Sequence, residues 1–76
     1  MYLMISCHDI DIMTNKFDNF DDACSAMKEE YNDFCDKYEV DKNNCFMCGI
    51  NDSKSNCYAY VKHEYLPDCS WRIIEV

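Results

Sequence analysis

The clearest pattern of apolar and polar positions lies in residues 19–38 and predicts one long helix. Apolar residues there recur so that they fall on one face of a helix, and the positions between them are mostly acidic. Asn19 is placed to cap the amino end, with Asp22 as the acidic residue of a capping box. The predicted apolar face consists of Phe20, Ala23, Cys24, Met27, Tyr31, Phe34, Cys35 and Tyr38.

Alternating patterns on both sides of this helix predict strands. Residues 2–8 have apolar side chains at both alternating sets of positions, which indicates a central strand covered on both faces. Weaker alternation predicts a second strand within residues 10–17. Beyond the helix we predict a polar connection at 39–44, strands at 46–50, 57–63 and 71–76, a turn at 51–56 and a loop at 64–70.

This order of elements predicts an α+β fold, in which one long amphipathic helix packs on one face of a small antiparallel or mixed sheet of three to five strands. The 76 residues leave room for a single domain, residues 1–76, and they include one Gly and one Pro, so no flexible linker is expected. One helix covers only one face of the sheet. Tyr58, Tyr60 and Trp71 are candidates for a contact surface on the other face.

A Cys-x-x-Cys-Gly pattern at residues 45–49 resembles a zinc knuckle. Zinc prefers four ligands, so Cys45 and Cys48 would need Cys57 and Cys69, or His63 or His8 in place of one thiol. The spacing is not that of a standard zinc module, because a second Cys-x-x-Cys is missing. The alternatives are small core or turn residues, or a redox pair, although no strand-to-helix junction accompanies the motif. We therefore expect no cofactor, with structural zinc as the alternative.

The chain contains seven cysteines, an odd number that does not indicate a complete disulfide framework. Several of them occupy positions where a buried apolar residue is expected. The first apolar run, residues 2–5, is short for a signal peptide, and no run approaches the length of a membrane span. These observations predict reduced thiols in a cytoplasmic protein without a membrane partner.

Catalytic motifs are weak. Cys7 and His8, followed by Asp9 and Asp11, contain the residue types of a nucleophile and a base. Adjacent strand residues point to opposite faces, however, so we interpret Cys7 as a core residue and His8 as a surface residue at the strand end. We expect no enzymatic activity, although a homodimer could assemble a site shared between two chains.

Charge is distributed unevenly along the chain. Residues 1–40 contain ten acidic residues and three lysines, and they therefore hold almost all of the formal net charge of −8. An acidic helix face can steer a protein towards a larger basic partner, such as a nucleic-acid-binding effector, whereas direct binding of nucleic acid is disfavoured. The alternative is a solvated face that maintains solubility. The candidate partner-binding residues are Asp21, Asp22, Glu29, Asp33 and Asp36.

The composition adds a functional hypothesis. The chain is rich in Asn, Asp, Lys, Ile and Tyr and poor in Gly, Pro, Ala and Arg, as is typical of AT-rich coding DNA. Small size, acidity and the lack of catalytic residues resemble the general character of phage-encoded inhibitors of host defence, anti-CRISPR proteins included. The sequence therefore predicts a small non-catalytic interaction protein, encoded by a phage or mobile element, that inhibits a larger basic partner. The alternative is a small zinc-stabilised binding domain built on Cys45 and Cys48.

Overall fold

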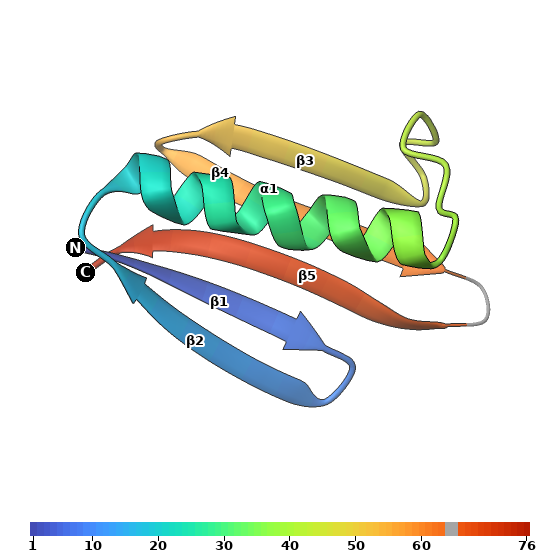
Figure 1. Ribbon diagram of the computed structural model, residues 1–76, viewed down its shortest axis with the longest axis horizontal. Coiled ribbons are helices and arrows are strands. Elements are labelled where there is room, and N and C mark those ends of the chain that lie inside the picture. The colour runs from blue at the N-terminus through green and yellow to red at the C-terminus, as the bar shows by residue number, and fades with distance from the viewer. Residues whose placement is uncertain (64–65) are drawn as a thin grey trace.

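One helix lies across a five-stranded antiparallel sheet, which confirms the predicted α+β class (Figure 1). The computed structural model describes residues 1–63 and 66–76, without the side chains of residues 63, 66 and 67. The elements are β1 (Tyr2–His8), β2 (Asp11–Phe17), α1 (Phe20–Lys37), β3 (Cys48–Ser53), β4 (Asn56–His63) and β5 (Leu66–Glu75).

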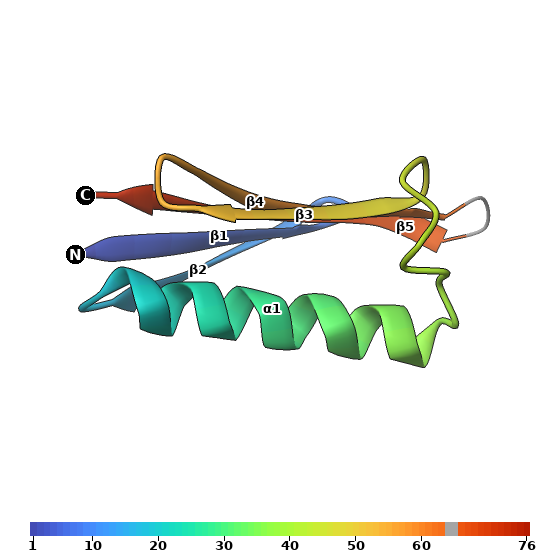
Figure 2. The same ribbon diagram turned by 90° about the horizontal axis from the view of Figure 1, so that it is seen from above.

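The strands are ordered β2-β1-β5-β4-β3, and every neighbouring pair is antiparallel. The last strand, β5, is therefore inserted between the two hairpins β1–β2 and β3–β4. This arrangement brings the two chain ends together, and the amide of Val76 donates to the carbonyl of Met1 at 2.9 Å (Figure 1). β1 has a neighbouring strand on each side, but the prediction that both of its faces are covered is wrong, because α1 packs on only one face of the sheet (Figure 2).

Local signals account for α1. The side-chain oxygen of Asn19 accepts a hydrogen bond from the amide of Asp22 at 2.8 Å, so the predicted cap is confirmed. At the other end, the amide of Val40 donates to the carbonyl of Cys35 at 2.9 Å. Glu39 takes the left-handed conformation with φ of 55°, as the closing residue of this helix-ending motif requires.

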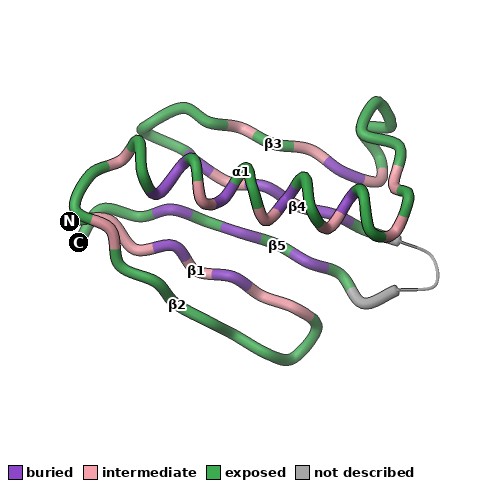
Figure 3. The backbone as a smooth tube through the Cα atoms, in the orientation of Figure 1, coloured by how far each residue is buried: buried purple, intermediate pink, exposed green. Residues whose placement is uncertain are grey.

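The apolar face of α1 packs on one face of the sheet and leaves the other face open (Figure 2). Buried residues alternate along β1, β4 and β5, while β2 is exposed almost throughout (Figure 3). No helix in the described ranges is long and apolar enough to cross a membrane. The hydrophobic core consists of Met4, Ala23, Cys24, Met27, Tyr31, Cys35, Cys48, Cys57, Ala59, Val61, Cys69, Trp71 and Ile73.

Two predicted boundaries are wrong. The predicted strand 46–50 starts only at Cys48, because the amides of Met47 and Cys48 both donate to the carbonyl of Asn44 and form a turn. The strand then continues through residues 51–53, which pair with β4, so the turn is shorter than expected.

The predicted loop at 64–70 is also wrong for residues 66–70, which belong to β5; residues 64–65 lie outside the described part of the chain. Cys69 and Ser70 pair with the end of β1 and with β4. A strand position between two neighbours thus overrides a composition that is typical of loops.

Candidate functional site

The outer face of α1 carries a row of carboxylates that we call the acidic ridge. It is defined by the five predicted partner-binding residues, and all five side chains are exposed. The helix α1 lies on the outside of the sheet (Figure 2), and the exposed ridge side chains are spread along its length. An 18-residue helix extends about 27 Å at 1.5 Å per residue. The ridge residues are Asp21, Asp22, Glu29, Asp33 and Asp36.

Lysines neutralise part of this surface. Lys42 Nζ lies 3.2 Å from Asp36 Oδ1 at the carboxyl end of the ridge. Lys28, beside the ridge, lies 2.8 Å from Asp52 of β3, and this hydrogen-bonded pair raises the pKa of Lys28 and lowers that of Asp52. Among the described residues, the other four ridge carboxylates, Asp21, Asp22, Glu29 and Asp33, have no such ion pair.

A hollow of about 320 Å³ opens beside Asp33 of the ridge. The carboxylates of Glu30 and Asp33 lie at its rim with two aromatic rings, and Glu30 also accepts a hydrogen bond from Trp71 Nε1 at 3.3 Å. Carboxylates beside aromatic faces are suited to an ammonium or guanidinium group. The lining residues are His8, Glu30, Asp33, Phe34, Lys37 and Tyr38.

The four candidate thiol ligands are distributed over different parts of the fold. Cys45 is exposed in the segment before β3, whereas Cys48 is buried at the start of β3. Cys48 and Cys69 both pair with Val61, so one strand separates them. Cys57 lies at the other end of β4, paired with Asp52 and Ile73.

These positions do not make a four-sulfur site. Neighbouring strands are about 4.8 Å apart, and successive residues along a strand are about 3.3 Å apart. The Cα atoms of Cys48 and Cys69, two strands apart, are therefore separated by about 10 Å, and the Cα atom of Cys57 is farther from both. Thiolates on one zinc each lie about 2.3 Å from the metal. The described residues contain no group of three or more His, Cys, Asp or Glu placed to hold a metal ion. The side chain of His63, the proposed substitute ligand, lies outside the described part.

Five of the seven cysteines are buried core residues, and none of the seven forms a disulfide. Burial raises the pKa of the Cys57 thiol to about 11, and the Cys24 thiol beside it acts in the same direction. Burial also raises the pKa of Cys35 and of Cys69. The raised pKa favours the neutral thiol at Cys35, Cys57 and Cys69, and a neutral thiol is a weaker nucleophile and metal ligand than a thiolate.

The assignment of Cys7 and His8 to sheet faces was wrong. The two side chains do point to opposite faces, but Cys7 lies on the face away from α1 and His8 lies on the helix side. His8 packs edge-on against Trp71, with ring centroids 5.7 Å apart. Trp71, offered as a contact residue, is itself buried against α1 by the same register. Both alternating sets of β1 are apolar, so the local pattern does not show which one meets the helix.

The structure instead pairs His8 with Cys69, a contact that sequence spacing could not reveal because the residues are 61 positions apart. Cys69 Sγ lies 3.2 Å from His8 Nδ1, as expected from their direct pairing between β1 and β5. The sulfur is buried, since Cys69 is 3% exposed, and burial raises the pKa of its thiol. The geometry therefore resembles a structural hydrogen bond more than an activated nucleophile and base.

Comparisons with known proteins identified no relative of this chain. No protein-family model matches the chain, and no match was found among curated proteins or solved structures.

Proposed function

We propose that this chain is a non-catalytic interaction protein that docks its acidic ridge on a larger basic protein. The observation that supports this function is the hollow beside Glu30 and Asp33. There, two carboxylates and the rings of Phe34 and Tyr38 line one hollow together with Lys37. A Lys or Arg side chain of the partner would enter the hollow, and the remaining carboxylates would steer the encounter. The cation of Lys37 already lies 5.3 Å from the ring centroid of Tyr38 in this region.

The finer proposal is that the partner is a nucleic-acid-binding effector and that the chain inhibits it. A row of carboxylates along a straight helix can occupy a groove that binds a phosphate backbone. The AT-rich composition supports an origin in a phage or mobile element, and the place of action would be the cytoplasm.

A charge-reversal pair tests the ridge. The probe is a fluorescently labelled arginine-rich peptide, and binding is followed by polarisation. We expect Glu29→Lys/Asp33→Lys to weaken binding at least about tenfold, or about 1.4 kcal/mol. The matched control, Asp11→Lys/Asp68→Lys, changes the net charge equally at exposed positions away from α1 and should bind nearly as the parent does. Equal losses in both variants would show that only net charge matters and would refute a ridge-specific site.

Inhibition is tested separately. A photo-crosslinking residue at position 25, on the exposed side of α1, would identify a partner that contacts the ridge. Nucleic acid should then displace the chain from that partner in competition. A crosslinked partner whose complex is indifferent to nucleic acid would contradict the proposed mimicry while leaving the ridge contact in place.

A further inference from the structure

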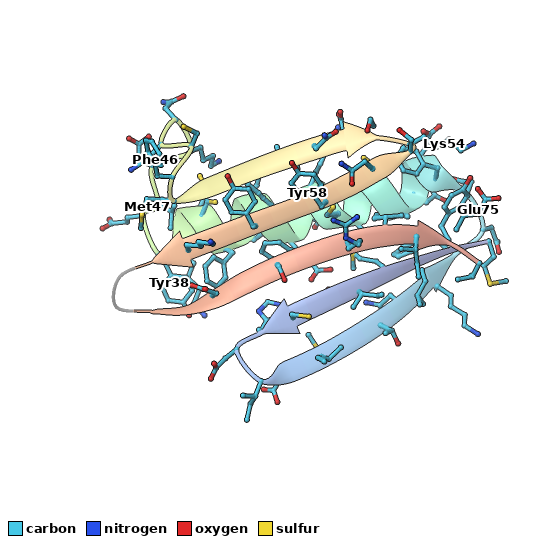
Figure 4. All side chains as sticks on the ribbon, turned by 180° about the vertical axis from the view of Figure 1, so that it is seen from behind. Tyr38, Phe46, Met47, Lys54, Tyr58 and Glu75 are labelled. Carbon is cyan, nitrogen blue, oxygen red and sulfur yellow. The ribbon has the colours of Figure 1, made fainter. Side chains whose placement is uncertain are left out.

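The sheet face turned away from α1 is the second organised surface of the molecule, and we call it the open face. Tyr58 projects from the middle of this face towards the viewer in Figure 4. Strand pairing aligns its side chains in rows across β1, β5 and β4. One row contains Ile5, Arg72 and Tyr58, and the next contains Cys7, Ser70 and Tyr60.

These two rows enclose a hollow of about 380 Å³ with a mostly apolar lining. Cys7 and Ser70 are small residues in a row that ends in the large ring of Tyr60, so the surface dips between them. Concave apolar surfaces with a few placed polar groups are the usual form of binding sites. The hollow is large enough for one large aliphatic or aromatic side chain of a partner.

The charge of the open face is opposite to that of the whole chain. Lys16, Lys62 and Arg72 are exposed on this face, and Asp68 near one end is the acid among its described residues. The molecule is therefore polarised, with carboxylates along the helix and cations on the far side of the sheet, although its net charge is −8. A partner segment that binds here must be complementary to positive charge.

Arg72 is held in a defined orientation over the hollow. Its guanidinium carbon lies 5.6 Å from the ring centroid of Tyr58, and its Nη1 donates to Asn56 Oδ1 at 3.2 Å. A guanidinium group has five N–H donors, and the ring and the amide orient it while using few of them. The remaining donors suit a carboxylate, which accepts two parallel hydrogen bonds from arginine.

We propose that the open face binds an acidic segment of a partner protein, with an apolar side chain in the hollow and a neighbouring carboxylate on Arg72. A single-stranded nucleic acid fits less well, because it adds one negative charge per nucleotide against a chain of net charge −8. A symmetric dimer through this face would place the two sets of cations against each other. The site lies on the opposite side of the sheet from the acidic ridge, so the chain would contact two segments of opposite charge.

Selection from a display library of random short peptides tests the inference. We expect the enriched peptides to contain Asp or Glu beside a large apolar residue. Affinity for a synthesised representative should fall at least about tenfold with Arg72→Glu and with Tyr58→Ala, since a charge-assisted hydrogen bond contributes about 1.5–3 kcal/mol. Lys54→Glu is the matched control, because it makes the same charge change at an exposed turn and should retain binding. Arg72→Gln removes the positive charge without reversing it and should also weaken binding. Trp71 fluorescence checks that the variants are folded.

Five results would overturn the proposal. Enriched peptides without acidic residues would contradict it, as would acidic peptides that bind equally well to the Arg72→Glu protein. Tight binding of labelled oligothymidylate that competes with the peptide would identify the face as a nucleic-acid site instead. A dimer that dissociates on Arg72→Glu would assign the face to a second copy of the chain. Enrichment of basic peptides alone, lost in Glu29→Lys/Asp33→Lys, would support the acidic ridge while refuting this site, so the two proposals fail separately.

Discussion

The aromatic ring of Tyr60 lies across Gly49 on the neighbouring strand. A Cβ atom at Gly49 would meet Cε1 of Tyr60 at 2.7 Å, and the Tyr60 hydroxyl donates to the carbonyl oxygen of Cys45 at 2.9 Å. Gly49 has a negative φ, so the close approach of the ring, and not the backbone conformation, requires glycine here. The Gly of the Cys-x-x-Cys-Gly pattern thus makes room for a ring of the open face.

Gly49→Ala should lower the free energy of unfolding by about 1–2 kcal/mol, because the added methyl group displaces a ring held by a hydrogen bond. Urea denaturation followed by circular dichroism measures this loss. In a Tyr60→Ser background the ring is absent, and the same change at Gly49 should cost little. Equal losses in both backgrounds would contradict the contact.

Stability should fall in alkaline solution because of the buried thiols. The folded pKa of Cys57 is about 11, above an unfolded value of about 8.5. A raised pKa means that the folded state retains the proton longer, so its contribution is complete below about pH 8.5 and is lost as the pH rises towards 11. Urea denaturation under reducing conditions should show that the free energy of unfolding declines as the pH rises. This decline should be less steep in Cys57→Ala. The same decline of the free energy of unfolding with pH in both proteins would exclude the Cys57 thiol as its cause.

The acidic ridge should reduce the stability of the helix that carries it. Glu29 and Asp33 are four positions apart, and like charges at this spacing destabilise a helix by about 0.2–0.5 kcal/mol. Glu29→Gln/Asp33→Asn should therefore raise the free energy of unfolding by about that amount at low ionic strength, and less in high salt. Asp11→Asn on β2 serves as the control. A loss of stability in the ridge variant at both ionic strengths would argue against charge repulsion.

Metal content is a direct test of the zinc hypothesis. Because strand pairing separates Cys48, Cys57 and Cys69, we expect native mass spectrometry of the freshly purified, reduced chain to show no bound zinc. A chelator should leave the melting temperature unchanged. A mass increase of one zinc per chain that is lost with chelator would refute this expectation and identify Cys45 and Cys48 as ligands.

The helix and most strands follow from local physical chemistry. The apolar face of α1, its Asn19 cap and the exposure of the acidic ridge depend on residues within a few positions of one another, so the sequence predicts them correctly. The ends of β3 and β5 are not determined by residues within a few positions of them. Pairing across strands, of Asn51 with Tyr58 and of Cys69 with His8, decides whether these residues lie in a strand or in a connection.

The sequence by itself therefore determined the fold class, the helix and its charged face, because helical periodicity and capping act over single turns. Only the tertiary structure decided which face of the sheet is covered, since β1 is apolar on both faces and insertion of β5 beside it sets the register. That register buries Trp71, pairs His8 with Cys69 and separates the candidate zinc ligands. It also assembles the hollow of the open face, whose lining residues come from three strands that meet only in the folded sheet.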